Sequence, residues 1–239
     1  MKAVVCSLFL YPIRIHSYKL SSIVIFLDIS GFLDSDDENP FDPDNVVCMV
    51  NTLQPGTSLA AAGYVLYSSS TFLTMTIGNG VYGFTLDETM GEFVLSHPCI
   101  QIPESKNIMS FNEANWDLWD KPMQEVHNGW RTGTGSLGTR YTSRYVGSMV
   151  ADVHRTLLYG GVFGYPADEK NPSGKLRLLY EAAPMSFLME QAGGLSTTGT
   201  ERIMQLVPEN VHQRVPVIMG SKSEVEEVIS AYKDYATKV

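Results

Sequence analysis

The segment GKLRLLYE, residues 174–181, places two cations and one carboxylate inside an otherwise apolar run. Read as a β-strand, whose successive side chains point to opposite faces, it puts Lys175, Arg177 and Glu181 on one face. The alternate positions, which would face the core, are Leu176, Leu178 and Tyr180. The octapeptide alone favours a half-buried strand with a solvated charged face. The alternative is an anion site of lysine and arginine beside a carboxylate that binds a hard cation.

Glu181 stands where this predicted strand meets a helix predicted over residues 182–191. Sites in layered α/β folds favour strand ends. A helix N-terminus also stabilises a carboxylate in its charged form, by roughly 0.3–1 kcal/mol. Glu181 is therefore either a metal ligand or an ordinary N-terminal helix carboxylate, and the local sequence leaves both interpretations open.

Four further side chains are candidates for binding an anion. Arg144 and Tyr145 precede a helix predicted over residues 146–159, and a helix N-terminus with an arginine can bind phosphate. A surface arginine at a helix start explains the same pattern. Tyr165 is either a core aromatic or a phosphate-binding hydroxyl, and Asn112 is also typical of a turn.

Three other polar residues are predicted to be structural. His154 and Arg155 lie inside the predicted helix, and neither has a partner at catalytic spacing; His212 is interpreted in the same way. The patterns GxSxG, GxxxxGK[ST] and HExxH do not occur in the sequence. Serine-nucleophile and nucleotide-binding functions therefore lack support.

The composition is that of an ordinary globular protein of one large domain or two modest ones, with 239 residues, 44% of them apolar. The net charge of −9 makes nucleic acid and anionic membranes poor partners. The cysteines Cys6, Cys48 and Cys99 are far apart, which argues against a zinc site or a disulfide framework. A redox role for Cys48 stays open.

The first 27 residues are apolar, but Pro12, Arg14, His16 and Lys19 interrupt them before they reach a membrane-spanning length of roughly 20 apolar residues. A targeting segment is the less favoured alternative, because no small-residue cleavage site follows. Residues 34–44 carry six acids and two prolines, and we expect a solvated loop there rather than a calcium site.

Two halves with different patterns follow this loop. Strands at TFLTMTI and VYGFTL flank Gly78-Asn79-Gly80, which is a hairpin signal, and EFVLS continues a meandering antiparallel sheet. The second half alternates helices with strands at VFGYP, KLRLLYE and RVPVIMG. Ser223 with Glu226 predicts a capping box for a last helix.

Several long stretches together resemble fructose-1,6-bisphosphatase, over roughly residues 46–231. The C-terminal stretches are SRYVGSMVADVHRTLLYGG, GKLRLLYEAAPMSFLMEQAGG and VHQRVPVIMGS, and the upstream ones are LQPGTSLAAAGYVLYSSS and GVYGFTLDETMGEFVLS. The sequence is similar to plastid-type class I members, which carry an extra acidic loop. Sedoheptulose-1,7-bisphosphatase is a neighbouring alternative that the second stretch matches less well.

The resemblance implies an Mg²⁺-dependent hydrolysis of the 1-phosphate of fructose 1,6-bisphosphate. By position, it implies 6-phosphate binding by Asn112, Arg144, Tyr145, Tyr165 and Lys175. Arg144 would reach the site of a neighbouring subunit in a homotetramer, and Met149 and Lys175 would contact the sugar. Glu181 would be a metal ligand. Arg177, the expected catalytic residue, would lie near the metals and the transferred phosphoryl group.

The expected fold class is a layered α/β sugar-phosphatase fold, with a mixed C-terminal domain and a partial N-terminal antiparallel sheet. We expect an unmatched lead segment over residues 1–35, a remnant of the sheet domain over 36–103 and a substrate-binding domain over 104–239. The segment SIVIFL replaces a family strand in this interpretation. The resemblance also implies a place in gluconeogenesis or the Calvin cycle, in the plastid or the cytoplasm.

The metal motifs of the family's N-terminal half, a paired-glutamate segment and D-P-x-D-G-S-S, do not occur in this sequence. FDPDN at residues 41–45 lacks the Gly-Ser-Ser anion loop. A two-metal centre needs more than one carboxylate. We therefore expect a truncated form with weak or no activity, from a partial gene model or a real short protein. The alternative is a non-catalytic subunit that binds sugar phosphate or supports oligomerisation.

Overall fold

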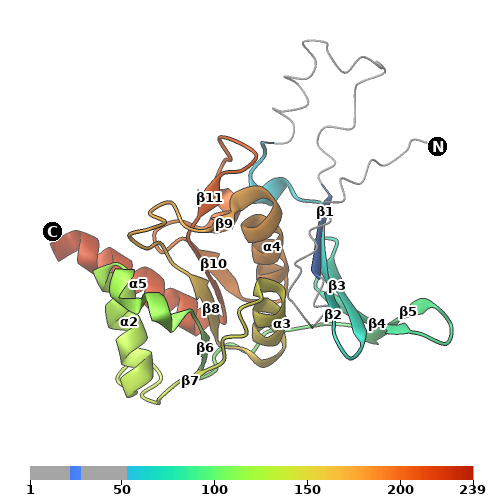
Figure 1. The fold of residues 1–239 in the computed structure, drawn as a ribbon, viewed down its shortest axis with the longest axis horizontal. Helices are drawn as coiled ribbons and strands as arrows, with labels where there is room; N and C mark the ends of the chain where they lie inside the picture. The colour runs from blue at the N-terminus through green and yellow to red at the C-terminus, as the bar shows by residue number, and fades with distance from the viewer. Residues whose placement is uncertain (1–21, 28–52, 239) are drawn as a thin grey trace, which may run out of the picture.

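The computed structural model describes residues 22–27 and 53–238. Within these residues the chain forms two five-stranded sheets, with a pair of helices between them and a second pair outside (Figure 1). None of the helices in the described part of the chain combines the length and apolarity that crossing a bilayer requires. The acidic loop, Cys6, Cys48 and the FDPDN segment lie outside the described residues.

The first sheet is antiparallel throughout, in the order β1-β2-β3-β4-β5. Its strands are β1 (Ser22–Leu27), β2 (Ala61–Tyr67), β3 (Thr71–Thr76), β4 (Tyr82–Asp87) and β5 (Glu92–His97). The hairpin predicted at Gly78-Asn79-Gly80 is confirmed, and both glycines have positive φ, which costs little without a Cβ. The SIVIFL segment is a strand of this sheet.

The second sheet is mixed, in the order β10-β12-β8-β6-β7. Its strands are β6 (Ile108–Ser110), β7 (Thr142–Ser143), β8 (Val162–Tyr165), β10 (Leu195–Thr197) and β12 (Val217–Gly220). A separate short pair joins β9 (Leu176–Arg177) to β11 (Arg214–Val215). The predicted single strand RVPVIMG is therefore wrong: Pro216 lacks an N–H, and the chain changes sheet there.

The helices form two layers, one on each face of the second sheet (Figure 1). Helices α3 (Met149–Tyr159) and α4 (Ala183–Gln191) lie between the two sheets, and α2 (Lys121–Thr132) and α5 (Lys222–Lys238) cover the outer face. The side chains of the second sheet alternate accordingly. Phe163 joins the inner core with Leu157 and Leu188, while Val162 joins the outer core with Trp130. The layered α/β fold is confirmed.

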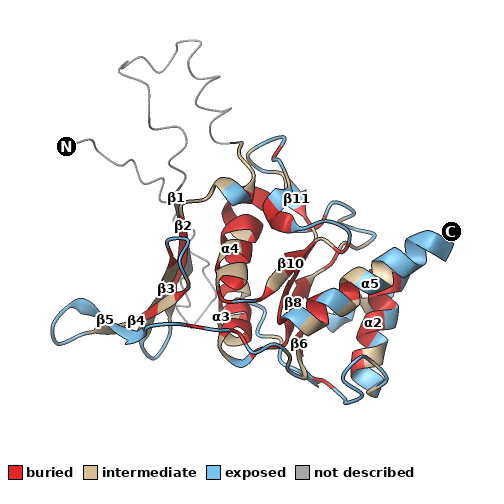
Figure 2. Ribbon diagram, turned by 180° about the vertical axis from the view of Figure 1, so that it is seen from behind, coloured by how far each residue is buried: buried red, intermediate tan, exposed pale blue. Residues whose placement is uncertain are grey.

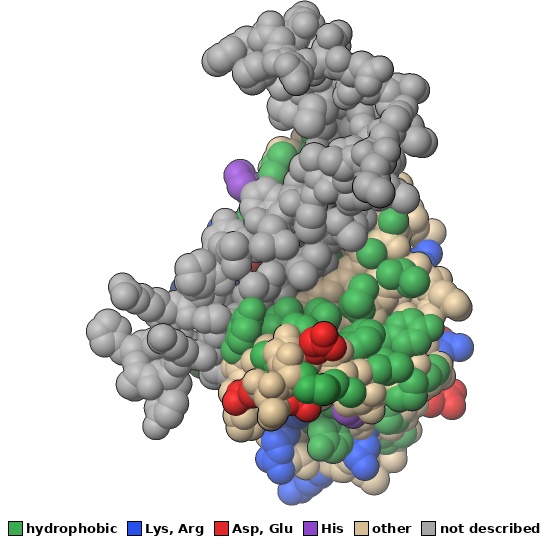
Figure 3. Space-filling view, turned by 90° about the vertical axis from the view of Figure 1, so that its right-hand side faces the viewer, with side chains coloured by type: hydrophobic (Ala, Val, Ile, Leu, Met, Phe, Trp, Pro, Cys, Tyr) green, Lys and Arg blue, Asp and Glu red, His purple; other side chains and the backbone are tan. Residues whose placement is uncertain are grey.

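Burial follows these layers closely (Figure 2). The facing surfaces of α3, α4 and the second sheet are buried, whereas the β4–β5 hairpin and the C-terminal turns of α5 are exposed. Hydrophobic side chains also gather on the side of the molecule where the first sheet lies (Figure 3). In β5 the side chains of Phe93, Val94 and Leu95 are each more than 40% exposed.

Two helices begin at other residues than the sequence predicts. The helix predicted to start at residue 146 begins at Met149, because Gly147 has a φ of +84° and Ser148 is extended. Its predicted end at Gly160 is confirmed. The last helix begins at Lys222 rather than after a capping box at Ser223. The Ser221 hydroxyl instead donates to Pro103 O and accepts from Gly161 N–H.

The largest correction concerns residues 175–181, which are not one strand. β9 ends at Arg177, and a π-helical turn, η3 (Leu178–Ala182), leads directly into α4, with Ala183 N–H bonded to Leu178 O. Leu178, Leu179 and Tyr180 are all buried, so no charged face alternates with an apolar one. The helical turn brings Glu181 back beside Arg177.

A partly buried histidine beside the inner core is held in its neutral form. The Tyr64 hydroxyl and His154 Nδ1 share a hydrogen bond of 2.8 Å, and the ring of Phe72 lies edge-on to the imidazole. Burial, followed by the nearby His97, lowers the pKa of His154 from 6.5 to about 4. His154 is therefore structural, as the sequence predicts, and it does have a partner.

This lowered pKa predicts an acid-sensitive core. Between pH 6.5 and pH 4 the unfolded chain binds a proton at His154 that the folded chain does not bind, so the free energy of unfolding decreases as the pH falls. We expect His154 to contribute up to about 3 kcal/mol of this loss, from about 1.4 kcal/mol per unit of pKa shift. Urea unfolding at pH 7 and pH 4.5 would measure it. His154→Gln should show a smaller loss than the original chain, and an equal loss in both would contradict the assignment.

Candidate substrate-binding site

The parallel strands of the second sheet bring three predicted site segments to one edge. β6 pairs in parallel with β7, where Met109 lies opposite Ser143, and with β8, where Ser110 lies opposite Phe163. Asn112 lies two residues after Ser110, and Tyr165 lies two residues after Phe163, the residue with which Ser110 pairs. The carboxyl ends of parallel strands lie at the same edge of a sheet, which is where layered α/β folds place their ligands.

Asn112 is fixed at this edge by its neighbour Phe111, which packs beneath β8. The Phe111 ring lies over Gly164, and a Cβ at Gly164 would come within 2.1 Å of Phe111 Cε1. Only glycine leaves space for this approach. Asn112 itself is partly exposed at the start of the 3₁₀ turn η2 (Glu113–Leu118).

Tyr145, Tyr165 and Lys175 form a contiguous polar group. The hydroxyls of Tyr145 and Tyr165 lie 2.5 Å apart, and the Lys175 ammonium lies 5.2 Å from the centre of the Tyr165 ring. Burial, followed by the hydrogen bond with Tyr165, raises the pKa of Tyr145. Tyr145 therefore keeps its proton at neutral pH. Two hydroxyls and an ammonium on three separate segments can together bind an anionic oxygen cluster.

Arg144 and Met149 flank this group on the same segment. The Arg144 backbone N–H donates to Met109 O at 2.8 Å, which continues the β6–β7 pairing, while its side chain is exposed and donates to Ser143 O. Met149 is the first residue of α3, is partly buried and packs against the inner core. The structure therefore places Arg144 in β7's continuation rather than at the helix N-terminus that the sequence predicted.

Arg177 and Glu181 form an ion pair across the π-helical turn. Arg177 Nη1 lies 3.3 Å from Glu181 Oε1, and the Arg177 backbone N–H donates to Glu181 Oε2 at 2.7 Å. Both side chains are partly exposed, so the pair is open to solvent. The guanidinium also lies over the Tyr180 ring, 5.7 Å from its centre.

The described residues do not fit a complete metal centre. Within residues 22–27 and 53–238 no group of three or more histidine, cysteine, aspartate or glutamate side chains is placed to hold a metal ion. Glu181 supplies one carboxylate, and both of its oxygens already have partners on Arg177. Mg²⁺ is typically bound by one or two carboxylates together with substrate oxygens, and a metal pair needs more.

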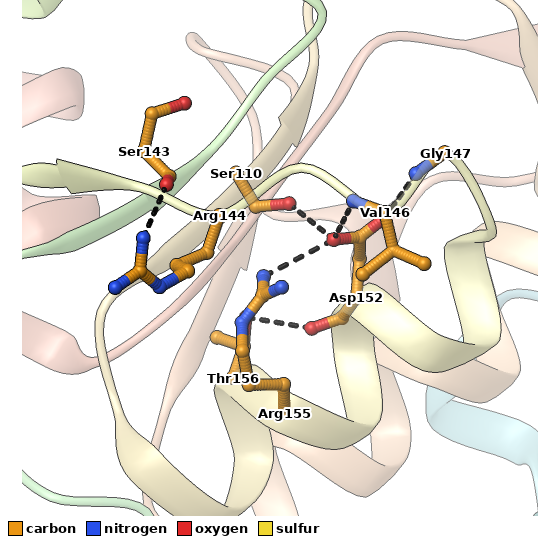
Figure 4. Close-up of polar contacts among 8 residues, drawn as sticks. All are labelled: Ser110, Ser143, Arg144, Val146, Gly147, Asp152, Arg155 and Thr156. Carbon is orange, nitrogen blue, oxygen red and sulfur yellow. Dashed lines mark hydrogen bonds and ion pairs between the residues drawn. The ribbon is translucent and has the colours of Figure 1, made fainter.

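Asp152 is a residue that the sequence analysis missed. It is fully buried, and its carboxylate accepts hydrogen bonds from the Ser110 hydroxyl and from the backbone N–H groups of Val146 and Gly147 (Figure 4). Arg155 Nη2 lies 3.1 Å from Oδ1. An acid in the first turn of a helix, after a glycine, is the only local signal for it, because Ser110 is 42 residues away.

The other two residues interpreted as structural also have partners. Arg155 pairs with Asp152, and His212 Nδ1 shares a hydrogen bond of 3.0 Å with the Tyr180 hydroxyl. Tyr180 in turn lies beneath Arg177. Each of these two residues therefore contacts a residue next to the predicted site: Arg155 contacts Asp152, and His212 contacts Tyr180.

Comparisons with known proteins match nearly the whole described region. The family model described as "Fructose-1-6-bisphosphatase, C-terminal domain" matches residues 102–233, and that described as "Fructose-1-6-bisphosphatase, N-terminal domain" matches residues 37–98. The crystal structure of Leishmania major fructose-1,6-bisphosphatase in holo form is 42% identical, with a TM-score of 0.77. The match covers 89% of this chain and 63% of that one.

Two curated relatives show how far the match extends. The chloroplastic fructose-1,6-bisphosphatase of Pisum sativum is 51% identical over 84% of this chain and 49% of the pea protein. The class 1 fructose-1,6-bisphosphatase of Maridesulfovibrio salexigens is 51% identical over 77% of this chain and 55% of the bacterial protein. The chain thus spans about half the length of the curated relatives that it matches.

Proposed function

This chain belongs to the fructose-1,6-bisphosphatase family, and we propose that it binds sugar phosphate as a fructose-1,6-bisphosphate 1-phosphatase does. The proposed binding group, called the clamp below, consists of Asn112, Tyr145, Tyr165 and Lys175. The reaction adds water to fructose 1,6-bisphosphate and gives fructose 6-phosphate and inorganic phosphate. The observation that carries this proposal is the contact of Tyr145, Tyr165 and Lys175 at the carboxyl edge of the second sheet. The names of the chloroplastic relatives support a plastid location and a role in the Calvin cycle.

In this proposal the 6-phosphate, which does not react, is the anchor of the substrate. Tyr145 and Tyr165 donate their hydroxyl protons to its oxygens, while Lys175 and Asn112 add a charge and an amide donor. The hydrogen bond between the two hydroxyls keeps them close in the free chain. Little ordering is then needed when the phosphate binds, which favours affinity. Met149 at the start of α3 supplies an apolar contact for the sugar.

The exposed side chain of Arg144 supports a contribution to a neighbouring subunit. Arg144 leaves the edge of the same sheet directly after Ser143, which pairs with Met109 of β6. Among the contacts described for its guanidinium there is only a local one, with Ser143 O. We propose a homotetramer in which Arg144 reaches the 6-phosphate of an adjacent clamp. A planar guanidinium suits bidentate binding of phosphate.

Arg177 is the proposed catalytic residue and Glu181 the proposed metal ligand. The π-helical turn holds their charged groups 3.3 Å apart, so a phosphoryl oxygen that approaches Arg177 also approaches Glu181. Mg²⁺ is the cofactor that the family resemblance implies, and one carboxylate is the share of its site found among the described residues. Arg177 neutralises charge on the transferred group in this proposal.

A second candidate function is a binding or oligomerisation subunit without catalysis. The observation that favours it is that Glu181, the one proposed metal carboxylate described, is already engaged by Arg177. We propose that the 239-residue chain alone binds sugar phosphate but hydrolyses it weakly or not at all. The two functions predict the same binding of sugar phosphate but different turnover. Distinguishing them therefore needs a binding measurement and a measurement of phosphate release.

Removing the ammonium of the clamp should weaken sugar-phosphate binding. We expect Lys175→Met to raise the Kd for fructose 6-phosphate by about 10-fold or more, because a charge-assisted hydrogen bond contributes about 1.5–3 kcal/mol. Isothermal titration calorimetry at low salt would measure it. The matched control is Lys222→Met, on exposed α5, whose ammonium lies 3.9 Å from Glu226.

Lys222→Met should leave the Kd unchanged. An unchanged Kd in Lys175→Met, with measurable binding by the original chain, would remove Lys175 from the clamp. A titration with sedoheptulose 7-phosphate tests the neighbouring alternative: tighter binding of the seven-carbon sugar would replace the fructose assignment.

The isolated chain should show little or no turnover. With Mg²⁺ and fructose 1,6-bisphosphate, we expect phosphate release close to that of the buffer, because a two-metal centre needs more carboxylates than Glu181 supplies. A colorimetric phosphate assay would measure it. Mg²⁺-dependent release well above buffer, lost in Arg177→Met, would show that the chain is a competent phosphatase.

A further inference from the structure

The buried carboxylate of Asp152 joins three segments of the proposed clamp. Its oxygens lie 2.6 Å from Ser110 Oγ and 3.0 Å from the N–H groups of both Val146 and Gly147. Ser110 ends β6, which leads into Asn112; Val146 follows Tyr145; and Asp152 itself lies on α3, which begins at Met149. These segments carry four of the six residues proposed to bind the 6-phosphate or the sugar; the other two are Tyr165 on β8 and Lys175, which precedes β9.

The pairing of β6 with β7 cannot hold this geometry by itself. β7 has two residues, and after Arg144 the chain turns through Gly147, whose φ is +84°, before α3 begins. Ser148 makes no side-chain cap at the start of α3. The carboxylate of Asp152 supplies the acceptors that this turn would otherwise lack (Figure 4).

Because Asp152 is fully buried, the loss of any of these contacts is costly. A carboxylate removed from water is costly unless it is hydrogen-bonded and its charge is compensated. Here three donors and the Arg155 guanidinium at 3.1 Å surround it. A shift of the turn would therefore break contacts with a buried charge, so the turn has one strongly preferred position.

We propose that Asp152 is a positioning residue that sets the place of Tyr145 relative to Asn112, and the direction in which Arg144 leaves for the adjacent clamp, and thereby the affinity of the clamp for sugar phosphate. Asp152 touches no substrate in this proposal; it acts through the turn at residues 144–147. The inference rests on the proposed function of the clamp, but its structural half, the fixing of the turn, can be measured without any ligand.

The test compares Asp152→Asn with Glu224→Gln in the full chain. Glu224 is a second fully buried carboxylate in the same fold. It accepts hydrogen bonds from the hydroxyls of Ser105 and Tyr141 and from the Lys106 N–H, ahead of β6 and β7 and so at the opposite end of these strands from the clamp. In Asp152→Asn, an NH2 group that cannot accept replaces one carboxylate oxygen, so either the Gly147 N–H or the Val146 N–H and the Ser110 hydroxyl lose their acceptor. Ser110→Ala removes one contact only and serves where Asp152→Asn fails to fold.

Two readouts are taken at a temperature where all variants are folded: the Kd for fructose 6-phosphate and the amide hydrogen exchange of residues 144–147 without ligand. We expect Asp152→Asn to weaken binding about 10-fold and to speed exchange at Val146 and Gly147. Ser110→Ala should act in the same direction by a smaller factor. Glu224→Gln should change neither readout, even where it lowers the melting temperature equally.

Unchanged affinity in Asp152→Asn, or in Ser110→Ala where the first variant does not fold, overturns the proposal. Equal losses of affinity in Asp152→Asn and Glu224→Gln also overturn it, since they indicate general destabilisation. If the original chain does not bind fructose 6-phosphate, the proposed function fails instead. Faster exchange at residues 144–147 then still supports the fixing of the turn, and unchanged exchange refutes it.

Discussion

The parallel pairing of β6 with β7 on one side and with β8 on the other determines where the polar side chains of this chain gather. Each pairing is only two residues long, yet it sends Asn112, Arg144 and Tyr165 out of the sheet at the same edge. Strands this short contribute few ladder hydrogen bonds. The edge therefore depends on side chains that reinforce it, namely Phe111 beneath β8 and the carboxylate of Asp152 between β6 and α3.

The site also depends on a second structural element, the π-helical turn after β9. A continuing strand would have put Arg177 and Glu181 four residues apart along the chain, roughly 13 Å from one Cα to the other. The turn instead allows Glu181 to accept the N–H of Arg177 and to meet its guanidinium. Such turns are uncommon and are often found at functional sites. Here the turn concentrates opposite charges at the entry to α4, beside the buried Tyr180.

Turn glycines and apolar periodicity are local signals, and they predicted the β3–β4 hairpin and α4 well; the layered fold was implied by the family resemblance. The prediction from the sequence was wrong at residues 178–181, where a short apolar run fits a strand and a helical turn alike. That run lacks valine, isoleucine and threonine, and its leucines and glutamate favour helix, which was an available signal. The roles of Asp152 and Tyr64 were not predictable, since their partners lie 42 and 90 residues away in the sequence.

A crystal structure of the chain with fructose 6-phosphate tests the clamp most directly. Oxygens of the 6-phosphate should lie within about 2.5–3.2 Å of the hydroxyls of Tyr145 and Tyr165 and of the Lys175 ammonium. Arg177 and Glu181 should face the C1 end of the sugar. A sugar phosphate bound elsewhere on the surface, with the Tyr145–Tyr165 hydrogen bond undisturbed and no phosphate beside it, would contradict the account.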